Sequence, residues 1–371
     1  MAFGLFKKKK KEKDVKNTKD KYLNLTVKEV IKETDKAVSV VFDTNAEKMP
    51  YEAGQFVTLI ETINGQKIRR AYSLCTSPFV DEFPAVTVKR VAGGAMSNHV
   101  NDTLLAGAQV EVMEPMGQFT TDYKSDRKRH LVLFAGGSGI TPLMAITKSV
   151  LFEEPQSIVS LVYANESESE IIFAESLKEL KDQYSDRLIV VHVLNNPPEN
   201  WDGHSGWMSV DKVKTIIEEL PKLDATVTEF FTCGPGPMMD IVVEGLESTG
   251  VAKDHIKLES FEAGKTSPKE IFGDASVTEG VAQPVKVIID DEEFNFDVPA
   301  DKTILEQGLE ENVDMPYSCQ SGLCTACRGK LHSGKVKMIE YDGLSQSEID
   351  DGYVLCCQAY AETDDVVIEI G

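Results

Sequence analysis

Three cysteines lie close together near the C-terminus, and two more follow them. Cys319, Cys324 and Cys327 have the spacing C-x4-C-x2-C in PYSCQSGLCTACRGK, and Cys356 and Cys357 are adjacent in YVLCCQAY. A loop with thiols at those three offsets wraps one side of an iron–sulfur cluster, and a later cysteine closes the coordination. Four thiolates bind the two irons of a 2Fe–2S cluster. The pattern therefore predicts such a cluster.

Other cysteine chemistry fits this pattern poorly. A zinc site usually pairs one C-x2-C with a second C-x2-C or with histidines, and the loop has one such pair. A thioredoxin-like C-x-x-C motif leaves three of the five cysteines unexplained. A disulfide between Cys356 and Cys357 would close a strained ring.

The segment from Val285 to Gly371 resembles the plant-type ferredoxins. In that family the last cluster ligand follows Leu-x and precedes x-Ala-Tyr. The resemblance therefore implies that Cys357 is the fourth ligand, beside Cys319, Cys324 and Cys327, and that Cys356 replaces a small residue. It also implies an α+β ferredoxin domain of the β-grasp type.

A second motif, RRAYSLCTSP at residues 69 to 78, suggests the electron donor of the cluster. An arginine followed by Tyr-Ser on a strand places a cation for a phosphate, a ring for a flat cofactor and a hydroxyl at its edge. In isolation these residues are equally compatible with an ordinary strand.

Residues 22 to 264 resemble the ferredoxin–NADP reductase superfamily, because R-x-Y-S is followed in order by GGAMSNHV, GGSGITPLM, FTCGPGPMM and LESF. The resemblance implies that Arg70 contacts the flavin phosphate, Tyr72 stacks on the isoalloxazine and Ser73 binds near its N5 atom. Ser73, Cys233 and Glu259 are its implied catalytic residues. The further flavin residues are Ala71, Gly94, Ala95, Met96, Ser97 and Phe261. A pyrophosphate site at a helix N-terminus implies FAD, with FMN as the alternative.

The turn GGSGITP follows the apolar run LVLFA and precedes a helical pattern, which is the context of a dinucleotide phosphate turn. The superfamily has this GGxGxxP form, with a proline suited to a first helical turn. The implied nicotinamide-nucleotide residues are Gly136, Gly137, Gly139, Thr141, Pro142, Cys233, Gly234, Pro235 and Met238.

The charge after SLVYAN bears on the choice of nucleotide. Glu166 would repel the 2′-phosphate of NADP and could accept a hydrogen bond from a 2′-hydroxyl, which favours NADH. Alternatively, Glu166 is a solvated loop charge and Lys178 or Lys181 contacts a 2′-phosphate, so that NADPH is the donor.

The periodicity of apolar residues along the chain predicts which kind of domain carries each motif. The chain has 371 residues, too many for one core, so we expect several domains. Short alternating strands in residues 22–126 predict an antiparallel β-barrel for the flavin. Strands alternating with helices in 127–264 predict a parallel α/β domain. A linker is expected at 265–283 and the ferredoxin domain at 284–371.

Charge and cysteine content constrain location and partners. The net charge of −22 disfavours nucleic acid, and residues 284–371 hold 19 acidic and 6 basic residues. The lysine-rich tail, residues 1–21, is expected to be disordered or to touch an anionic membrane weakly. Clustered cysteines without an evident secretory signal predict a cytoplasmic protein.

The predicted function is an NAD(P)H-dependent reductase that passes electrons through FAD and the cluster to an external acceptor. A reductase fused to a C-terminal ferredoxin resembles the reductase components of multicomponent oxygenases. This implies an oxygenase partner, with a di-iron enzyme such as phenylacetyl-CoA epoxidase as the leading candidate. A stand-alone reductase of a small molecule and a membrane-associated protein of electron transfer are the alternatives.

Overall fold

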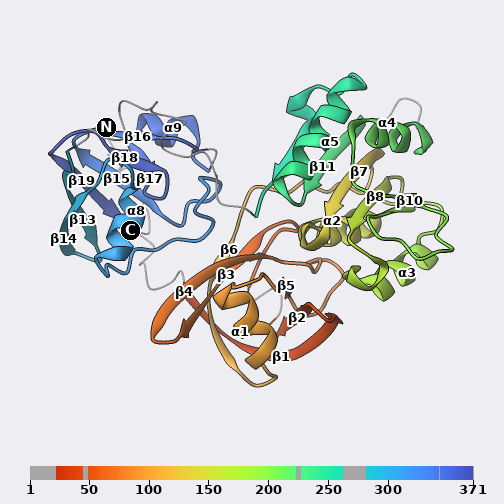
Figure 1. Cartoon of the computed structure of the whole chain (residues 1–371), viewed down its shortest axis with the longest axis horizontal. Coiled ribbons are helices and arrows are strands. Elements are labelled where there is room, and N and C mark those ends of the chain that lie inside the picture. The colour runs from red at the N-terminus through yellow and green to blue at the C-terminus, as the bar shows by residue number, and fades with distance from the viewer. Residues whose placement is uncertain (1–21, 45–48, 223–226, 262–280, 342, 371) are drawn as a thin grey trace, which may run out of the picture.

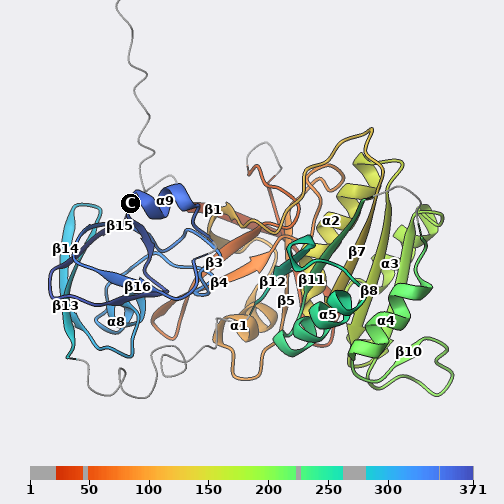
Figure 2. The ribbon, with the colours of Figure 1, turned by 90° about the horizontal axis from the view of Figure 1, so that it is seen from above.

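The computed structural model describes residues 22–44, 49–222, 227–261, 281–341 and 343–370. The predicted tail and most of the predicted linker lie outside these residues. Three main sheets form (Figure 1), and Figure 2 shows the first of them between the other two. In the described part of the chain, no helix is both long enough and apolar enough to cross a membrane.

The first sheet is antiparallel, with six strands in the order β4-β3-β6-β1-β2-β5. A bridge between Leu74 and Val86 joins the two outer strands and closes the sheet into the predicted barrel. Helix α1 (Ala95–Thr103) follows β5, which is one of these two outer strands. The strands are β1 (Tyr22–Thr34), β2 (Ala37–Phe42), β3 (Phe56–Ile63), β4 (Gln66–Ser73), β5 (Ala85–Lys89) and β6 (Gln109–Met116).

The second sheet is parallel, in the order β10-β9-β8-β7-β11-β12, as strands alternating with helices predict. Its strands are β7 (Arg129–Gly136), β8 (Ile158–Asn165), β9 (Leu188–Leu194), β10 (His204–Ser205), β11 (Val227–Cys233) and β12 (Ile256–Glu259). The two-residue β10 is too short to give a sequence signal. The helices are α2 (Ile140–Glu153), α3 (Ala174–Gln183), α4 (Val210–Glu219) and α5 (Gly236–Ser248), with short turns η2 (Gly137–Gly139), η3 (Glu168–Glu170) and η4 (Lys253–His255).

Alternation along β7 explains why helices cover both faces of this sheet. Leu131 and Leu133 belong to the core that includes α2 and α3, whereas Val132 and Phe134 belong to the core that includes α4 and α5. Because successive side chains of a strand point to opposite faces, a fully apolar strand needs a helical layer on each side. All eight residues of β7 are buried.

The C-terminal domain is a five-stranded mixed sheet, in the order β14-β13-β19-β15-β17, with a small second sheet of β16 and β18. The first two strands of the domain form a hairpin that turns at Asp290 and Asp291, whose φ angles of 49° and 67° lie in the left-handed region. Its elements are β13 (Gln283–Ile289), β14 (Glu292–Val298), α8 (Ile304–Glu310), β15 (Arg328–Ser333), β16 (Val336–Met338), α9 (Gln346–Asp350), β17 (Tyr353–Leu355), β18 (Ala359–Ala361) and β19 (Val366–Ile370).

Helix α8 ties the hairpin to the later cysteines. It begins at a capping box, in which the Thr303 hydroxyl accepts from the Glu306 N–H and the Glu306 carboxylate accepts from the Thr303 N–H. The Leu305 N–H donates to the Cys356 carbonyl at 3.0 Å. The helix therefore holds the backbone of the cysteine pair against the core.

A buried ionic network joins the barrel exit to the parallel sheet. Arg129, at the start of β7, donates to both oxygens of Glu154 at 2.8 and 3.0 Å. It also donates to the Thr121 hydroxyl and to Glu229, each at 2.8 Å. Arg129 and Glu154 are 1% and 0% exposed, so their buried charges need compensation, and their mutual contact is the shortest ion pair that Glu154 makes.

Removing one member should therefore destabilise the nicotinamide domain strongly. We expect Arg129→Met to lower the free energy of unfolding by about 3–5 kcal/mol, because the Glu154 carboxylate remains buried and loses both hydrogen bonds from the guanidinium. Urea unfolding can be followed by tryptophan fluorescence, since the only tryptophans, Trp201 and Trp207, lie in this domain. Lys214→Met, which removes an exposed helical pair with Asp211, is the control and should have little effect. Equal losses in the two variants would contradict the special role of the buried pair.

Candidate functional site

The predicted flavin residues line one cavity of about 390 Å³ at the barrel. The end of β4, the start of α1 and the turn before α2 form its walls. The predicted residues that it brings together are Arg70, Ala71, Tyr72, Ser73, Gly94, Ala95, Met96, Ser97, Thr141 and Phe261. Motifs that are separated by up to about 190 residues of chain thus line a single cavity.

The wall formed by α1 suits a pyrophosphate. Gly94 is the N-cap of this nine-residue helix, and the first-turn N–H groups have no partner within a helix. A Cβ atom on Gly94 would lie 2.7 Å from the Ser97 hydroxyl, so a side chain would crowd the turn. The Ser97 hydroxyl accepts from the Val91 N–H at 3.1 Å and fixes the incoming strand. A helix N-terminus of this kind favours an anion.

Four residues of this cavity were not predicted: Thr87, Lys89, Val91 and Ser138. Lys89 supplies a cation, and its Nζ lies 3.2 Å from a carboxylate oxygen of Glu170 in the nicotinamide domain. Only its position at the end of β5, just before GGAMS, could have indicated it in the sequence.

A second cavity, of about 320 Å³, continues from the first. It shares Arg70, Ala71, Ser73 and Phe261 with the flavin cavity. Its opposite wall belongs to the cysteine loop, with Ser318, Cys319, Gln320 and Leu323. A predicted cluster ligand therefore lies across one cavity from the serine predicted to bind flavin N5.

The three predicted catalytic residues form a group at this junction. Cys233 and Glu259 are register partners at the carboxyl ends of β11 and β12. The Ser73 hydroxyl donates to Glu259 at 3.4 Å. Burial raises the pKa of Glu259 to about 8, although the hydrogen bond from Ser73 opposes that shift. Burial, and then the charge of Glu259, raise the pKa of the Cys233 thiol.

The four predicted cluster thiols lie in two pairs. Cys319 interacts with Cys324, whose hydrogen bond is the main cause that holds the pKa of the Cys319 thiol below its ordinary value. Cys327 interacts with Cys357, whose neighbouring thiol raises the pKa of Cys327 well above its usual value. Two thiolates for each of two irons is the ligand arrangement of a 2Fe–2S cluster. No group of three or more His, Cys, Asp or Glu that could hold a metal ion is found in the described residues.

The geometry separates the two adjacent cysteines. Both are buried in the domain core, but the Cys357 thiol hydrogen-bonds with the Cys327 thiol, whereas Cys356 makes only backbone hydrogen bonds to the neighbouring segments. The backbone of Cys356 bridges β15 and α8, because its N–H donates to Cys327 and its carbonyl accepts from Leu305. This favours Cys357 as the fourth ligand and a packing role for Cys356.

The cysteine loop also presents backbone donors to sulfur. The Ser321 N–H donates to Cys319 Sγ at 3.4 Å. Gly322 has a φ of +76°, and a Cβ there would meet the Glu340 carbonyl oxygen at 2.4 Å. Glycine is therefore required where the loop passes beneath the segment before α9. Such N–H donors stabilise thiolate charge on a cluster.

The nicotinamide turn packs directly on the turn that carries Cys233. A Cβ on Gly139 would lie 2.0 Å from the Cys233 carbonyl oxygen, and one on Gly136 would lie 2.6 Å from Met238 Sδ and 2.8 Å from Pro235 Cδ. The predicted nucleotide residues of β7–α2 and β11–α5 therefore adjoin, with Pro142 buried in the first turn of α2.

Glu166 lies apart from that turn, one residue beyond β8 at the carboxyl edge of the sheet. Its two carboxylate oxygens accept from the side-chain amides of Asn195 and Asn196. The loop after β9 therefore holds the Glu166 carboxylate in a fixed orientation, unlike a carboxylate that contacts only solvent. Lys178 and Lys181 lie on α3.

Comparison with known proteins finds relatives for all three domains. The chain matches three domain families: an oxidoreductase FAD-binding domain at residues 22–121, an oxidoreductase NAD-binding domain at 133–244 and a 2Fe-2S iron-sulfur cluster binding domain at 287–362. These matches identify an oxidoreductase whose cofactors are FAD, a nicotinamide nucleotide and a 2Fe–2S cluster.

Two curated relatives align along nearly their whole length. The ferredoxin reductase component of 3-ketosteroid-9-alpha-monooxygenase from Rhodococcus rhodochrous is 37% identical, over 93% of this chain and 96% of that protein. A subunit of the 1,2-phenylacetyl-CoA epoxidase from Escherichia coli is 33% identical, over 93% of this chain and 97% of that protein. In fold, the chain resembles phthalate dioxygenase reductase with a TM-score of 0.57 and 24% identity, over 95% of this chain and 99% of that one.

The cysteine geometry makes a direct prediction. Cys357→Ser should lose or severely disturb the cluster, because a thiolate that faces Cys327 is removed. Cys356→Ser should keep a native-like 2Fe–2S signal at some cost in stability, since it changes a core residue. Iron and acid-labile sulfide per chain, together with visible circular dichroism, measure both. The reverse pattern would mean that Cys356 is the ligand.

The pKa of Glu259 makes a prediction about pH and stability. The native carboxyl keeps its proton up to about pH 8, against an ordinary value of 4.5. The native state therefore binds the proton more tightly than the unfolded state between these values, and its stability falls as pH rises. Relative to Glu259→Gln, the wild-type free energy of unfolding should decrease from pH 6 to 8 by up to about 1.4 kcal/mol per unit. Urea unfolding at several pH values measures this difference, and a constant difference would contradict the assignment.

Proposed function

This chain belongs to the ferredoxin reductase components of oxygenases, and we propose that it takes electrons from NADH and delivers them singly to the oxygenase of such a system. The observation that supports this most is the cavity shared by Ser73 and Cys319, since it joins the flavin strand to the cysteine loop. When bound, FAD accepts a hydride from the nicotinamide nucleotide and passes single electrons to the 2Fe–2S cluster.

The residues of the chain position and tune these groups. Arg70 and the N–H groups at the start of α1 bind the phosphates, and Tyr72 supplies the stacking surface. Below about pH 8 the protonated Glu259 and the Ser73 hydroxyl are neutral groups at the flavin edge, which avoids a buried negative charge there. Gly139 and Gly234 lack side chains, so the two turns that carry the nucleotide motifs pack directly against each other at the carboxyl end of the sheet.

NADH is the proposed donor because Glu166 stands where the 2′-substituent of the adenosine ribose is recognised in such sheets. An oriented carboxylate accepts a hydrogen bond from a 2′-hydroxyl and repels a 2′-phosphate. Its fixation by two asparagines lowers the entropic cost of that recognition.

The proposed acceptor is the oxygenase component of a multicomponent system in the cytoplasm. The leading candidate is a di-iron enzyme of the phenylacetyl-CoA epoxidase type, by similarity to the matched component of that system. The acidic character of residues 284–371 favours a partner with a basic docking surface.

An anaerobic titration tests the electron path. Stepwise addition of NADH should first bleach the flavin absorbance and then produce the low-temperature electron paramagnetic resonance signal of a reduced 2Fe–2S cluster. Bleaching without that signal, in protein with full iron and sulfide content, would contradict transfer from flavin to cluster. The same titration with NADPH should proceed more slowly.

Charge reversal tests the nucleotide assignment. Glu166→Arg should raise the ratio of kcat/KM for NADPH to that for NADH by at least about tenfold, because a repulsive charge becomes a phosphate ligand. Glu168→Arg, a nearby exposed change, is the matched control. An unchanged ratio in Glu166→Arg would exclude the carboxylate as the determinant.

A further inference from the structure

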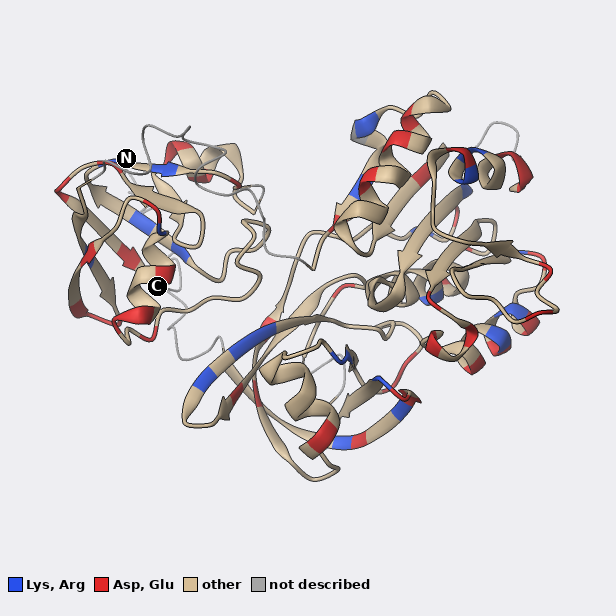
Figure 3. Ribbon diagram, in the orientation of Figure 1, with Lys and Arg blue, Asp and Glu red and all other residues tan. Residues whose placement is uncertain are grey.

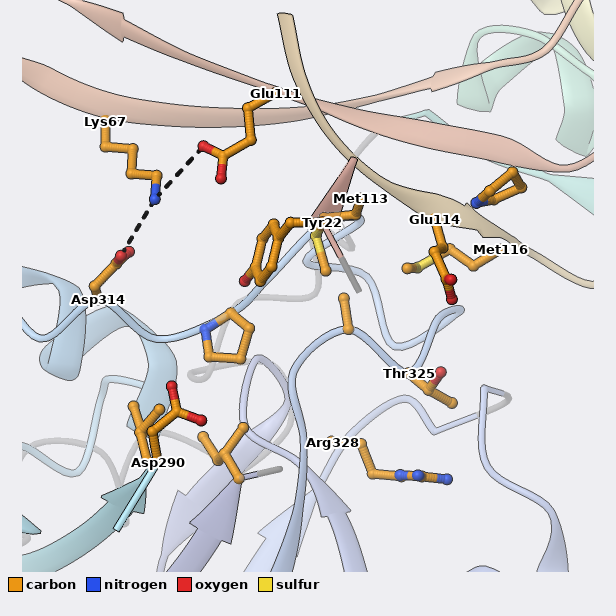
Figure 4. A pocket seen from close by; sticks show the side chains of 15 residues that line it. Tyr22, Lys67, Glu111, Met113, Glu114, Met116, Asp290, Asp314, Thr325 and Arg328 are labelled. Atoms are coloured by element: carbon orange, nitrogen blue, oxygen red, sulfur yellow. Dashed lines mark hydrogen bonds and ion pairs between the residues drawn. The ribbon is translucent and has the colours of Figure 1, made fainter. Parts of the chain in front are cut away.

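The ferredoxin domain contacts the flavin barrel through polar groups. Asp314, just before the cysteine loop, accepts from Arg69 of β4 at 2.7 Å and lies 3.4 Å from Lys67 of the same strand. The Thr58 hydroxyl of β3 donates to the Ser318 hydroxyl at 2.5 Å. Figure 4 shows Lys67 between Asp314 and Glu111, and Figure 3 shows the basic residues of β4 on the side toward the ferredoxin domain.

Arg69 is the buried member of this contact. Its side chain is 2% exposed, its guanidinium lies 5.4 Å from the centre of the Tyr317 ring, and its Nε has no hydrogen-bond partner. Asp314 retains 61% exposure. Partial burial raises the pKa of Asp314, but Arg69 and Lys67 outweigh it and hold that pKa below its ordinary value. The contact is therefore an ion pair with one desolvated cation that separation of the domains would return to water.

The interface is not tightly packed. A cavity of about 400 Å³ lies between the domains beside Asp314, lined on the barrel side by Lys67 and Glu111 and on the ferredoxin side by Thr325 and Arg328. Polar, incompletely packed contacts of this kind are typical of domains that separate.

The cysteine loop has only one accessible side. Among the four predicted ligands, Cys319 alone is not buried. Within residues 319–326, every residue that is not buried lines one of the two cavities at the barrel: Cys319, Gln320, Leu323, Thr325 and Ala326.

The remaining approach to the cluster is covered by the chain itself. The segment before α9 lies on the loop, since the Gly343 N–H donates to the Gly322 carbonyl at 2.8 Å. A Cβ on Gly343 would lie 2.9 Å from the Cys324 N–H nitrogen. Cys327 and Cys357 belong to the domain core.

We propose that electrons enter and leave the cluster through the same face, formed by Asp314, Tyr317, Ser318, Cys319 and Thr325, so that the external acceptor competes with the flavin barrel for it. The acceptor is a protein that presents a cationic side chain to Asp314 in the place of Arg69. This inference rests on the proposed function and adds the docking surface and the chemistry of the partner.

In this proposal the ferredoxin domain docks on the flavin barrel twice in each turnover. NADH releases two electrons and one proton, and becomes NAD+. Each docking carries one electron to the cluster and each separation delivers one electron to an acceptor. One NADH therefore reduces two one-electron acceptor molecules, with a proton released.

A charge swap between Arg69 and Asp314 distinguishes binding of the flavin barrel to this face from binding of the external acceptor. The probe is cytochrome c, a basic one-electron acceptor protein, and its binding to the complete oxidised protein is measured without NADH. Internal transfer is measured separately, as the rate of cluster reduction after rapid mixing with NADH. The variants are Arg69→Asp, Asp314→Arg, the double swap of the two, and Asp314→Asn as a milder change.

Arg69→Asp should slow internal transfer by about tenfold and leave the affinity for cytochrome c unchanged or higher. Asp314→Arg should impair both, and Asp314→Asn should impair both less severely. The double swap should restore internal transfer to within about threefold while cytochrome c binding stays at least about tenfold weaker. Glu340→Lys, an exposed change that lines neither cavity, is the control for net charge and should preserve both.

A double swap that binds cytochrome c as tightly as the wild type would overturn the proposal, because the acceptor would then use another face. If Glu340→Lys weakened cytochrome c binding as much as Asp314→Arg, the proposal would also be overturned. Cytochrome c would then be attracted by the overall negative charge of the domain. Iron and sulfide content and visible circular dichroism confirm that each variant is folded. Failure of NADH to reduce flavin or cluster in the wild type would instead contradict the proposed function, and the binding data would still be read independently.

Discussion

The structure depends on bringing a cluster thiol across a single cavity from the flavin strand, since electron transfer weakens steeply with distance. Ser73 and the predicted cluster ligand Cys319 line that cavity from domains whose contact includes an ion pair and a hydroxyl pair. An extensive apolar interface would hold the same geometry more firmly, but it would also cover the accessible side of the cysteine loop permanently. A polar contact with one buried cation permits close approach and release, because separated charges regain hydration.

Two buried carboxylates show how the surroundings assign different tasks to the same chemical group. Glu154 is held by two hydrogen bonds from Arg129, and its role is to join the barrel exit to the parallel sheet. Glu259 has the Ser73 hydroxyl instead of a cation, and burial raises its pKa to about 8. A carboxyl that keeps its proton near neutral pH is available at the flavin edge as a donor, whereas a paired carboxylate is structural.

Local motifs were readable in the sequence because each needs fixed residue types within about ten positions. The cysteine spacing, the Arg-x-Tyr-Ser strand and the glycine turn of β7 are of this kind. Apolar periodicity predicted the antiparallel and the parallel domain, whereas the class of the ferredoxin domain came from the family resemblance. The contacts that join domains were not readable. Arg69 and Asp314 are ordinary surface charges in sequence terms, and nothing in the local pattern indicates that they meet. The hydrogen bond between Ser73 and Glu259 spans 186 residues and depends on how the barrel packs on the α/β domain.

The choice between Cys356 and Cys357 draws on both the sequence and the structure. The sequence offers adjacent thiols, and spacing alone accommodates either, so the family resemblance was needed to choose Cys357. The structure supplies an independent physical reason. The Cys356 N–H donates to the Cys327 carbonyl and the Cys356 carbonyl accepts from Leu305 of α8, so its backbone is fixed on both sides. Both adjacent cysteines are buried in the turn between β17 and β18, and the Cys357 thiol is the one that hydrogen-bonds with the Cys327 thiol. This contact favours Cys357 as the thiol that binds iron.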